Sequence, residues 1–372
     1  MNLLITGANG FMGKNLSQTL ALRDDTLFLA DVDTPEETLR EAAAKADFVF
    51  HLAGVNRPQN DAEFQTGNAD YTLTLLEMLK QGKCPPVLLS GSTQAALDNP
   101  YGISKRKAEE AVQAYAAATG AKVYCYRLTN AFGKWSKPNY NSAIATFCHH
   151  IARGLPITVS DPARVLRLVY IDDIVHAFIQ AMEGQPTVGQ DGFCTVRPEH
   201  EATLGQIVNM LEGFRDSRRT LTVPDQSEDF TRKLYATYQS FLPEDGFAFA
   251  PVTHEDARGS FTELLRLGQY GQVSVNISKP GICKGEHWHH TKHEKFIVVA
   301  GQGVIRFRSP FSSRVLSYHV SGAQLTVVDI PPGYTHNIEN LGTTDLVTLM
   351  WSSETFDPLN PDTYRLPVEP QA

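Results

Sequence analysis

The N-terminal stretch Met1–Leu16, MNLLITGANGFMGKNL, decides the fold of the first part of the chain. It predicts a short buried strand, a glycine-rich turn and a helix that begins near Phe11. Gly7 permits the turn, Gly10 lets the backbone approach a phosphate, and Gly13 allows the helix to pack closely. Because a helix N-terminus offers unpaired N–H groups and a positive dipole end, this unit is typical of pyrophosphate binding.

A second strand is predicted at Leu27–Ala30, and Asp31 follows it directly. A carboxylate at this point can accept both ribose hydroxyl groups of a dinucleotide and repels a 2′-phosphate, which favours NADH over NADPH. The alternative is that Asp31 or Asp33 only caps the next helix.

Further buried strands are predicted at Asp47–Gly54 and Val87–Ser92, and helical patterns separate all of these strands. Alternating strands and helices indicate an α/β fold with a Rossmann-type, doubly wound parallel sheet. We therefore expect residues 1–245 to form a dinucleotide-binding domain.

The segment Tyr101–Lys105, YGISK, lies at the start of a predicted helix. Its first and last residues are four apart and so share one helix face. An ammonium group beside a phenol lowers the pKa of the phenol, so Tyr101 can exchange a proton with a carbinol oxygen while Lys105 also holds the ribose. Ser92 would supply a second hydrogen bond. The alternative is an ordinary amphipathic helix end.

In this order, the glycine turn, HLAG, the serine strand and YGISK resemble the extended short-chain dehydrogenase/reductase family, whose members mostly act on nucleotide sugars. The resemblance covers about residues 1–245, with YRLTNAFGKW and LVYIDDIVHAF also fitting. It implies a catalytic set of Ser92, Tyr101 and Lys105. It also implies dinucleotide contacts from Gly7, Gly10, Phe11, Met12, Gly13, Asp31, Leu52, Ala53, Gly54 and Lys105. The segment between Ser92 and Tyr101 is shorter than in the sugar epimerases of that family, so substrate contacts stay unassigned.

After residue 245 the pattern changes to short runs of alternating apolar residues, such as QVSVNIS, KFIVVA and GVIRFR, with Gly and Pro between them. This pattern predicts an all-β sandwich or small barrel. We expect the second domain to comprise residues 246–372, with a Pro-rich tail after Asp357 that either wraps the barrel or frays.

Four side chains of this region form a candidate metal site: His287, His289, Glu294 and His336. On a strand, side chains two residues apart point to the same face, so His287 and His289 can converge on one ion. Three imidazoles and one carboxylate suit zinc, iron, manganese or nickel rather than calcium. The alternative is an exposed histidine-rich loop, because His290 and His293 lie here as well.

The same residues resemble the two signatures of the cupin family. The first signature is met by Gly281, His287, His289, Glu294 and Gly301. The second is met by Pro331, Gly333, His336 and Asn340, whereas Leu325 replaces its leading glycine. The resemblance implies a metal-binding all-β cupin barrel.

The motif DARGSFTEL, with Asp256, Arg258, Gly259 and Phe261, resembles the opening of the keto-sugar 3,5-epimerases, which share the cupin fold. Those enzymes usually work without a metal, and their histidine base would fall close to His287. Because His287 is assigned to the ion here, the identity of an epimerase acid and base stays open. The alternative acid and base candidates are Lys284, His290, Lys292 and Tyr334, each of which can also be an ordinary solvated side chain.

The composition limits the partners of the chain. Its 372 residues carry a net charge of −8, from 33 Lys and Arg against 41 Asp and Glu, without a long block of one sign, so nucleic acid is not an expected partner. The five cysteines are scattered and form no CxxC motif, which favours a reducing compartment. No apolar run approaches the roughly 20 residues that span a bilayer, so we expect a cytoplasmic protein without a membrane partner.

Over its whole length the chain resembles the bifunctional capsular-polysaccharide enzymes of UDP-N-acetyl-L-fucosamine synthesis, with HWHHTK and YTHNIENLG among the matching segments. The resemblance implies carbon-3 epimerisation of a UDP-2-acetamido-2,6-dideoxy-4-keto-hexose in the cupin. It then implies NAD(P)H-dependent reduction at carbon 4 to UDP-N-acetyl-6-deoxy-L-talosamine, for capsular or O-antigen polysaccharide. It also implies zinc, a homodimer and NADPH, whose 2′-phosphate Arg57 could hold.

Two alternatives stay open. In the first, the chain is only a nucleotide-sugar reductase or dehydratase, and the cupin is a zinc-stabilised dimerisation module without chemistry of its own. In the second, the chain is a non-enzymatic sensor that binds a dinucleotide. The intact set of Ser92, Tyr101 and Lys105 argues against the second alternative.

Overall fold

A computed structural model describes residues 1–370, which form two compact units. The N-terminal unit comprises Met1–Glu212 and Ser227–Pro243. The C-terminal unit comprises Gly213–Gln226 and the residues from Glu244 onward. The chain therefore passes from one unit to the other three times, and the single domain limit predicted at residues 245 and 246 stays a prediction.

The N-terminal unit is built on a parallel sheet whose strands lie in the order β2-β1-β3-β4-β5. β1 (Asn2–Thr6) lies between its neighbours, with Leu3 paired to Leu27 of β2 and to Phe48 of β3. Its interior is apolar because both faces of a parallel sheet are covered. The predicted α/β fold with a Rossmann-type parallel sheet is confirmed.

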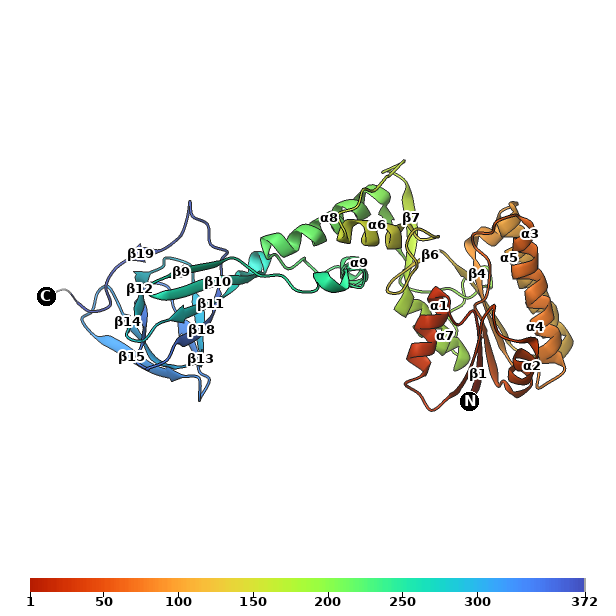
Figure 1. Cartoon of the computed structure of the whole chain (residues 1–372), viewed down its shortest axis with the longest axis horizontal. Coiled ribbons are helices and arrows are strands. Elements are labelled where there is room, and N and C mark those ends of the chain that lie inside the picture. Colours follow the sequence, from red (N-terminus) through yellow and green to blue (C-terminus); the bar gives the residue numbers. More distant parts are fainter. Residues whose placement is uncertain (371–372) are drawn as a thin grey trace. The chain divides into compact units, whose positions relative to one another are not determined.

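Helices cover both faces of this sheet (Figure 1). On one face, α1 and α7 pack together, and their apolar residues join Leu3 and Ile5 in one core. On the other face, α2, α4 and α5 pack around Leu4 and Val49. Successive residues of β1 thus point to opposite cores, as the strand period requires. These helices span Phe11–Leu20 (α1), Glu36–Lys45 (α2), Tyr71–Lys80 (α4), Pro100–Thr119 (α5) and Ile171–Met182 (α7).

A smaller sheet of order β6-β7-β8 completes the N-terminal unit, with β6 parallel and β8 antiparallel to β7. The remaining strands of the unit are β2 (Thr26–Ala30), β3 (Phe48–His51), β4 (Val87–Ser92), β5 (Val123–Leu128), β6 (Asn130–Phe132), β7 (Val165–Tyr170) and β8 (His200–Thr203). The remaining helices are α3 (Ala62–Phe64), the π-helix η1 (Gln65–Asp70), the 3₁₀ helix η2 (Thr93–Ala96), α6 (Ala143–Ala152) and α9 (Asp229–Gln239). The helix α8 (Leu204–Thr220) begins in this unit, and its residues from Gly213 onward belong to the C-terminal unit.

The C-terminal unit consists of two antiparallel sheets, of orders β16-β13-β18-β11-β10-β9 and β15-β14-β17-β12-β19. In β11, QVSVNIS, buried and partly buried residues alternate strictly, as expected for a strand with one inward face. Phe296, Ile305 and Ile338 lie in the core of the unit. The elements are η3 (Glu244–Gly246), β9 (Thr253–Asp256), β10 (Gly259–Arg266), η4 (Gly268–Tyr270), β11 (Gln272–Ser278), β12 (Cys283–Trp288), β13 (Glu294–Ala300), β14 (Gln302–Arg308), β15 (Val315–Ser321), β16 (Val327–Ile330), β17 (Thr335–Asn340), β18 (Leu346–Ser352) and β19 (Tyr364–Arg365). The predicted all-β second region is confirmed.

The tail after Asp357 lies against the C-terminal unit up to residue 370. Of the two predictions for this tail, the one that it wraps the barrel is therefore confirmed. β19 pairs with β12, with Tyr364 opposite Trp288. Farther along, the Val368 N–H donates to the Glu286 carboxylate (2.5 Å). None of the helices in residues 1–370 is long and apolar enough to span a membrane.

Candidate active site and metal centre

The glycine-rich turn joins β1 to α1, and two of its glycines leave no room for a side chain. Gly7 has a φ of 68°, and a Cβ atom on it would lie 2.7 Å from the backbone nitrogen of Ala53. A Cβ atom on Gly13 would lie 2.1 Å from the Gly7 carbonyl oxygen, so α1 approaches the turn closely only because residue 13 is glycine. Gly10 caps α1, which leaves the first N–H groups of the helix available to an anion.

Asp31 follows β2 and holds the glycine-rich turn. One carboxylate oxygen accepts the Asn9 N–H (2.7 Å), and the other accepts the Val32 N–H (2.8 Å). The Asp31 N–H in turn donates to the Thr34 hydroxyl (2.8 Å). The carboxylate therefore has a structural task in the turn, and its predicted contact with a ribose stays a prediction.

A cavity of about 1100 Å³ opens beside this turn. The predicted residues that line it are Gly7, Gly10, Phe11, Met12, Gly13, Leu52, Gly54, Ser92, Tyr101 and Lys105. Asp31 and Ala53 do not line it. Most of the residues predicted for dinucleotide binding and proton transfer thus meet at one cavity, at the end of β1 and β4 where a parallel sheet usually binds its ligands.

The start of α5 fixes the position of Tyr101. Asn99 caps the helix, because its side-chain oxygen accepts the Gly102 N–H (2.7 Å), and Pro100 follows as the first helical residue. Tyr101 is therefore in the first turn, where its hydroxyl group donates to the Asn56 side-chain oxygen (3.0 Å). This contact holds the phenol within the cavity.

Lys105 lies one helical turn later and is buried. Its Nζ atom is 5.9 Å from the centre of the Tyr101 ring and 3.5 Å from the Ser90 carbonyl oxygen. Ser92, the last residue of β4, accepts the Gln94 N–H at its hydroxyl oxygen (3.2 Å). The three predicted catalytic side chains thus come from one strand and one helix.

Burial changes the pKa values of this set. It raises the pKa of Tyr101, against a smaller lowering contribution from a hydrogen bond with Ser92. It lowers the pKa of Lys105 to about 8, although Glu109 acts in the opposite direction. The expectation that Lys105 lowers the pKa of the phenol is therefore not met, because removal from water is the largest contribution and raises this pKa.

Asn68, which was not predicted as a site residue, connects three parts of the site. Its side-chain oxygen accepts the Val55 N–H (2.8 Å), and its amide group donates to the Val55 carbonyl (3.1 Å) and to the Ser104 hydroxyl (3.0 Å). A Cβ atom on Gly54 would lie 2.8 Å from the Asn68 oxygen and 2.9 Å from Lys105 Nζ. Asn68 lies in the π-helix η1, a rare element that is frequent at functional sites.

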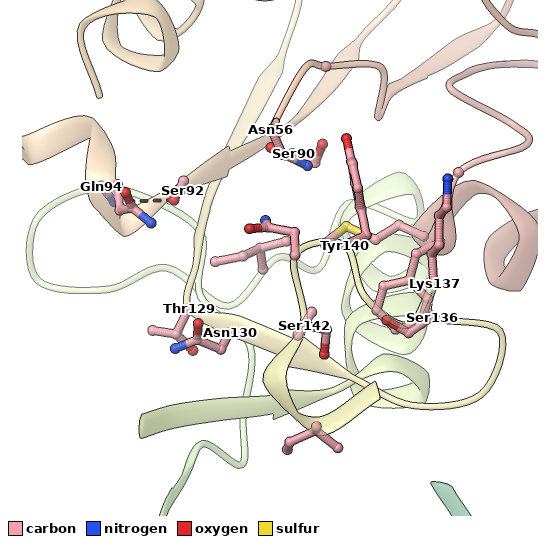
Figure 2. Close-up of a pocket in the computed structure, with 18 of the residues that line it drawn as sticks. Asn56, Ser90, Ser92, Gln94, Thr129, Asn130, Ser136, Lys137, Tyr140 and Ser142 are labelled. Atoms are coloured by element: carbon pink, nitrogen blue, oxygen red, sulfur yellow. Dashed lines mark hydrogen bonds between the residues drawn. The ribbon is translucent and has the colours of Figure 1, made fainter. Parts of the chain in front are cut away.

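The side of the cavity that faces Ser92 carries polar and cationic side chains that were also not predicted. Ser92 and Gln94 lie on one side, and Ser136, Lys137 and Tyr140 lie on the other (Figure 2). Arg164 lines the cavity as well. Lysine and arginine beside an apolar wall suit an anionic ligand with an organic body. The segment YRLTNAFGKW precedes these residues in the sequence.

The four candidate metal ligands converge in the C-terminal unit. One nitrogen or oxygen from each of His287, His289, Glu294 and His336 lies within 4.8 Å of all the others. His289 Nε2 is 3.3 Å and His336 Nε2 is 3.5 Å from the same oxygen of Glu294. Burial alone would raise the pKa of Glu294, but its contacts with His289 and His336 lower it below the usual range. Burial also lowers the pKa of His287 to about 4.

A second cavity, of about 380 Å³, is lined by three of these four residues, His287, His289 and Glu294. Four further titratable side chains line it: His254, Glu263, Lys292 and Glu354. Lys292 is the only one of these that was a predicted acid or base candidate. Lys284 donates instead to the Asn276 side-chain oxygen (2.9 Å), and His290 packs against Trp288 (ring centres 4.5 Å apart). Neither Lys284, His290 nor Tyr334 lines the cavity.

Each of the two parts of the chain matches a known protein family. Residues 3–191 match the NAD dependent epimerase/dehydratase family. Residues 254–364 match the polysaccharide biosynthesis C-terminal domain family. The first range contains every residue that lines the first cavity except Leu204, and the second contains every residue that lines the second cavity.

Full-length relatives are also similar. The UDP-2-acetamido-2,6-beta-L-arabino-hexul-4-ose reductase of Pseudomonas aeruginosa is 42% identical over 370 residues, which cover 99% of each chain. The crystal structure of the capsular polysaccharide assembling protein CapF from Staphylococcus aureus superposes with a TM-score of 0.94 at 53% identity, over 99% of this chain and 100% of CapF. A structure of CapF with the inhibitor 3-isopropenyl-tropolone has a TM-score of 0.89 at 48% identity, with the same coverage. The chain therefore belongs to the NAD dependent epimerase/dehydratase family and, over its whole length, to the two-unit capsular polysaccharide proteins represented by CapF, as a nucleotide-sugar enzyme of polysaccharide biosynthesis.

Proposed function

We propose that the chain performs two successive steps on one UDP-linked sugar. The C-terminal unit inverts carbon 3 of a UDP-2-acetamido-2,6-dideoxy-4-keto-hexose, and the N-terminal unit reduces the carbon-4 ketone with NAD(P)H. The product is UDP-N-acetyl-6-deoxy-L-talosamine. The observation that carries this proposal is the presence of two separate cavities in one chain, one with Ser92, Tyr101 and Lys105 and the other with His287, His289 and Glu294.

In the reduction, Tyr101 is the proton donor. Burial disfavours its phenolate, so the hydroxyl group is protonated at neutral pH, as a group that protonates a carbinol oxygen must be. The Ser92 hydroxyl group supplies a second hydrogen bond to that oxygen. Lys105 lies one helical turn away and holds the ribose. The dinucleotide supplies the hydride when bound.

The cluster in the C-terminal unit fits a divalent metal ion, and zinc is the ion that we propose. His336 Nε2 is buried and has no hydrogen-bond partner among residues 1–370, and burial keeps His287 neutral, as a ligand must be. When bound, such an ion supplies positive charge beside a ketone oxygen.

The inversion needs a base and an acid from the second cavity. A ketone at carbon 4 makes the proton on carbon 3 acidic, because the negative charge that forms is shared with the oxygen. A side chain on one face removes this proton, and a second side chain returns a proton on the other face. The groups available are His254, Glu263, Lys292 and Glu354. Reduction then removes the inverted ketone and pulls the reversible inversion forward.

The substrate class rests on two observations. The Pseudomonas aeruginosa relative is named for a UDP-linked 2-acetamido hexose with a ketone at carbon 4. In this chain, Lys137 and Arg164 line the first cavity, and both are suited to the diphosphate of such a sugar. The homodimer implied by the sequence resemblance stays a prediction.

A second candidate function is reduction alone, with the C-terminal unit serving only as a metal-stabilised structural module. It is favoured by the name of the Pseudomonas aeruginosa relative, which mentions a reductase and no epimerase. The two candidates differ in the configuration of the product at carbon 3.

Product analysis separates the two candidates. The full-length, zinc-loaded protein is incubated with the uninverted UDP-4-keto sugar and either NADH or NADPH, and the product is identified by proton NMR. We expect the 6-deoxy-L-talo configuration, with carbon 3 inverted and carbon 4 reduced. A reduced sugar with the original carbon-3 configuration would instead identify a reductase without epimerase activity.

A further inference from the structure

The tail segment Pro361–Thr363, which we call the clamp, contacts the candidate metal site directly. The Nδ1 atom of His289 lies 2.6 Å from the Asp362 carbonyl oxygen. A carbonyl oxygen only accepts, so Nδ1 carries the proton and donates it, which leaves Nε2 as a lone pair. The Nε2 atom is the one that faces Glu294, at 3.3 Å. The clamp therefore selects the histidine tautomer that can bind a metal.

The Asp362 carboxylate fixes the loop that separates two of the candidate ligands. It accepts the N–H groups of His290 (2.9 Å), Thr291 (2.9 Å) and Lys292 (2.8 Å). These three amides lie between His289 and Glu294 in the sequence. Asp362 has a φ of 38°, a left-handed value that Asp, Asn and Gly tolerate better than other residues do. A single residue thus orients one ligand by its carbonyl group and holds the loop by its side chain.

The clamp also holds the Lys292 ammonium group at the wall of the second cavity. The Nζ atom donates to the Pro361 carbonyl (2.9 Å) and to the Thr363 hydroxyl (2.9 Å). An ammonium group has three N–H donors, so one remains for a group inside the cavity. Lys292 is one of the residues that line this cavity.

We propose that the clamp Pro361–Thr363 is a positioning device that aligns the metal ligand His289 and the Lys292 cation for one substrate. Asp362 is the positioning residue for the metal, and Thr363 is the positioning residue for the ammonium group. The remaining Lys292 N–H then faces the oxygen on which negative charge develops when carbon 3 loses its proton. This inference rests on the proposed metal site and on the proposed epimerisation.

Metal binding tests the Asp362 part. Full-length Asp362→Gly and Asp362→Asn both accept the left-handed backbone, but the first removes the carboxylate and the second keeps one acceptor oxygen. Zinc release to the chromophore 4-(2-pyridylazo)resorcinol and the visible spectrum of the cobalt-loaded protein are measured. We expect Asp362→Gly to bind zinc about 10- to 100-fold more weakly, with an altered cobalt spectrum, and Asp362→Asn to lie in between.

A matched control comes from the same tail. The Asp357 carboxylate accepts the Leu359 N–H (2.9 Å) and the Asn360 side-chain N–H (3.5 Å), both within the tail. We expect Asp357→Asn to bind zinc as the wild type does. Zinc affinity of Asp362→Gly within twofold of the wild type, with an unchanged cobalt spectrum, would overturn the role of Asp362.

Thr363→Val tests the Lys292 part. Valine has the shape of threonine but offers no acceptor for the ammonium group. We expect unchanged zinc affinity and a fall of about tenfold in the rate of deuterium exchange at carbon 3 of the UDP-4-keto sugar. An unchanged exchange rate would overturn this part.

Two readouts separate a failure of the clamp from a failure of the proposed function. Reduction of a UDP-4-keto sugar that is already inverted at carbon 3 depends on the first cavity. We expect every clamp variant to catalyse this reduction at the wild-type rate. This result would also show that the variants fold. Wild-type protein that binds no zinc, or exchanges no deuterium, would overturn the proposed function together with the clamp. Normal wild-type behaviour with unaffected clamp variants would overturn the clamp alone.

Discussion

Tyr101 and Lys105 are four residues apart on α5, and burial acts on both of them in the direction that favours the neutral form. For the tyrosine this is the form that a proton donor needs. For the lysine it means that a cation is held in the cavity at a cost in stability. In the proposed reduction Tyr101 is the proton donor, whereas the buried Lys105 ammonium group costs stability.

Tyr101→Phe should remove reduction and leave binding intact. The ring of Tyr101 packs against Phe64 (ring centres 5.4 Å apart), and phenylalanine keeps this contact while losing only the hydroxyl group. We expect the turnover number to fall about 10²- to 10⁴-fold, which is the usual contribution of general acid catalysis. NAD(P)H affinity, measured by fluorescence titration, should change less than threefold, roughly. Turnover at the wild-type rate would remove Tyr101 from its role.

Lys105→Met should stabilise the N-terminal unit near neutral pH. Below pH 8 the folded state holds a buried ammonium group, and the gap between the ordinary pKa of 10.5 and about 8 corresponds to roughly 3 kcal/mol. The penalty is fully present below pH 8 and disappears as the pH rises towards 10.5, because lysine is then neutral in both states. We expect the free energy of unfolding of the variant to exceed that of the wild type by up to about 3 kcal/mol at pH 7 and by much less at pH 10, as measured by urea unfolding.

The control for this variant is Lys107→Met on the same helix, whose side chain is exposed and donates to Gln65 (2.8 Å). It should change the unfolding free energy by less than about 0.5 kcal/mol at either pH. A destabilised Lys105→Met protein at pH 7, or a gain that is the same at both pH values, would contradict the account.

Asp31 should set the choice between NADH and NADPH. Its carboxylate lies just after β2, where it accepts two backbone N–H groups, and its negative charge disfavours a 2′-phosphate. We expect the wild type to prefer NADH, and Asp31→Asn, which keeps one acceptor oxygen, to shift the ratio of kcat/KM values towards NADPH by about tenfold. Equal ratios in wild type and variant would show that Asp31 acts only in the turn.

At the scale of elements, the contact between the turn and α1 depends on glycine. A Cβ atom on Gly13 would meet backbone atoms of Gly7 and Ala8 at 2.1 and 2.7 Å, and backbone cannot move aside as a side chain can. We expect Gly13→Ala to weaken NAD(P)H binding at least about tenfold, because α1 must shift away from the turn. Gly213→Ala is the control, since nothing lies within 4 Å of a Cβ atom there in α8. Alanine at that position should be neutral or stabilise by up to about 1 kcal/mol. Equal binding by Gly13→Ala and wild type would contradict this packing.

The elements also show what could be predicted from the sequence. β1, the turn and α1 follow from a local pattern, since apolar runs, glycines and helix starts are decided by neighbours in the chain. The convergence of His287, His289, Glu294 and His336 was predicted from strand periodicity and two sequence signatures, and the structure brings these side chains together. Whether they bind a metal stays a prediction.

Other parts of both sites could not be predicted, because they depend on contacts between distant segments. Asn68 contacts Ser104, 36 residues away, and Asp362 contacts His289, 73 residues away. Neither residue stands in a local pattern that marks it. The pKa direction of Tyr101 was also missed, because the sequence shows that a lysine is near but not how much water the fold removes.

For the whole molecule, the account predicts that the two reactions can be separated by mutation. Glu294→Gln removes the only carboxylate of the metal cluster. We expect it to bind zinc at least about tenfold more weakly and to lose carbon-3 exchange, because the charge that balances the ion is gone. Reduction of an already inverted ketone should continue at the wild-type rate, as followed by NAD(P)H absorbance. Loss of both activities together would show that the units do not work independently.

The most direct test of the two-reaction account is deuterium incorporation with the nicotinamide withheld. A UDP-4-keto-6-deoxy-N-acetylhexosamine is incubated with the full-length protein in deuterated buffer and followed by proton NMR. The account predicts deuterium at carbon 3 with the wild type and with Tyr101→Phe, and none with Glu294→Gln. Absence of deuterium with the wild type, when binding of the sugar is demonstrated in the same sample, would contradict epimerisation and leave a reductase with a structural C-terminal unit.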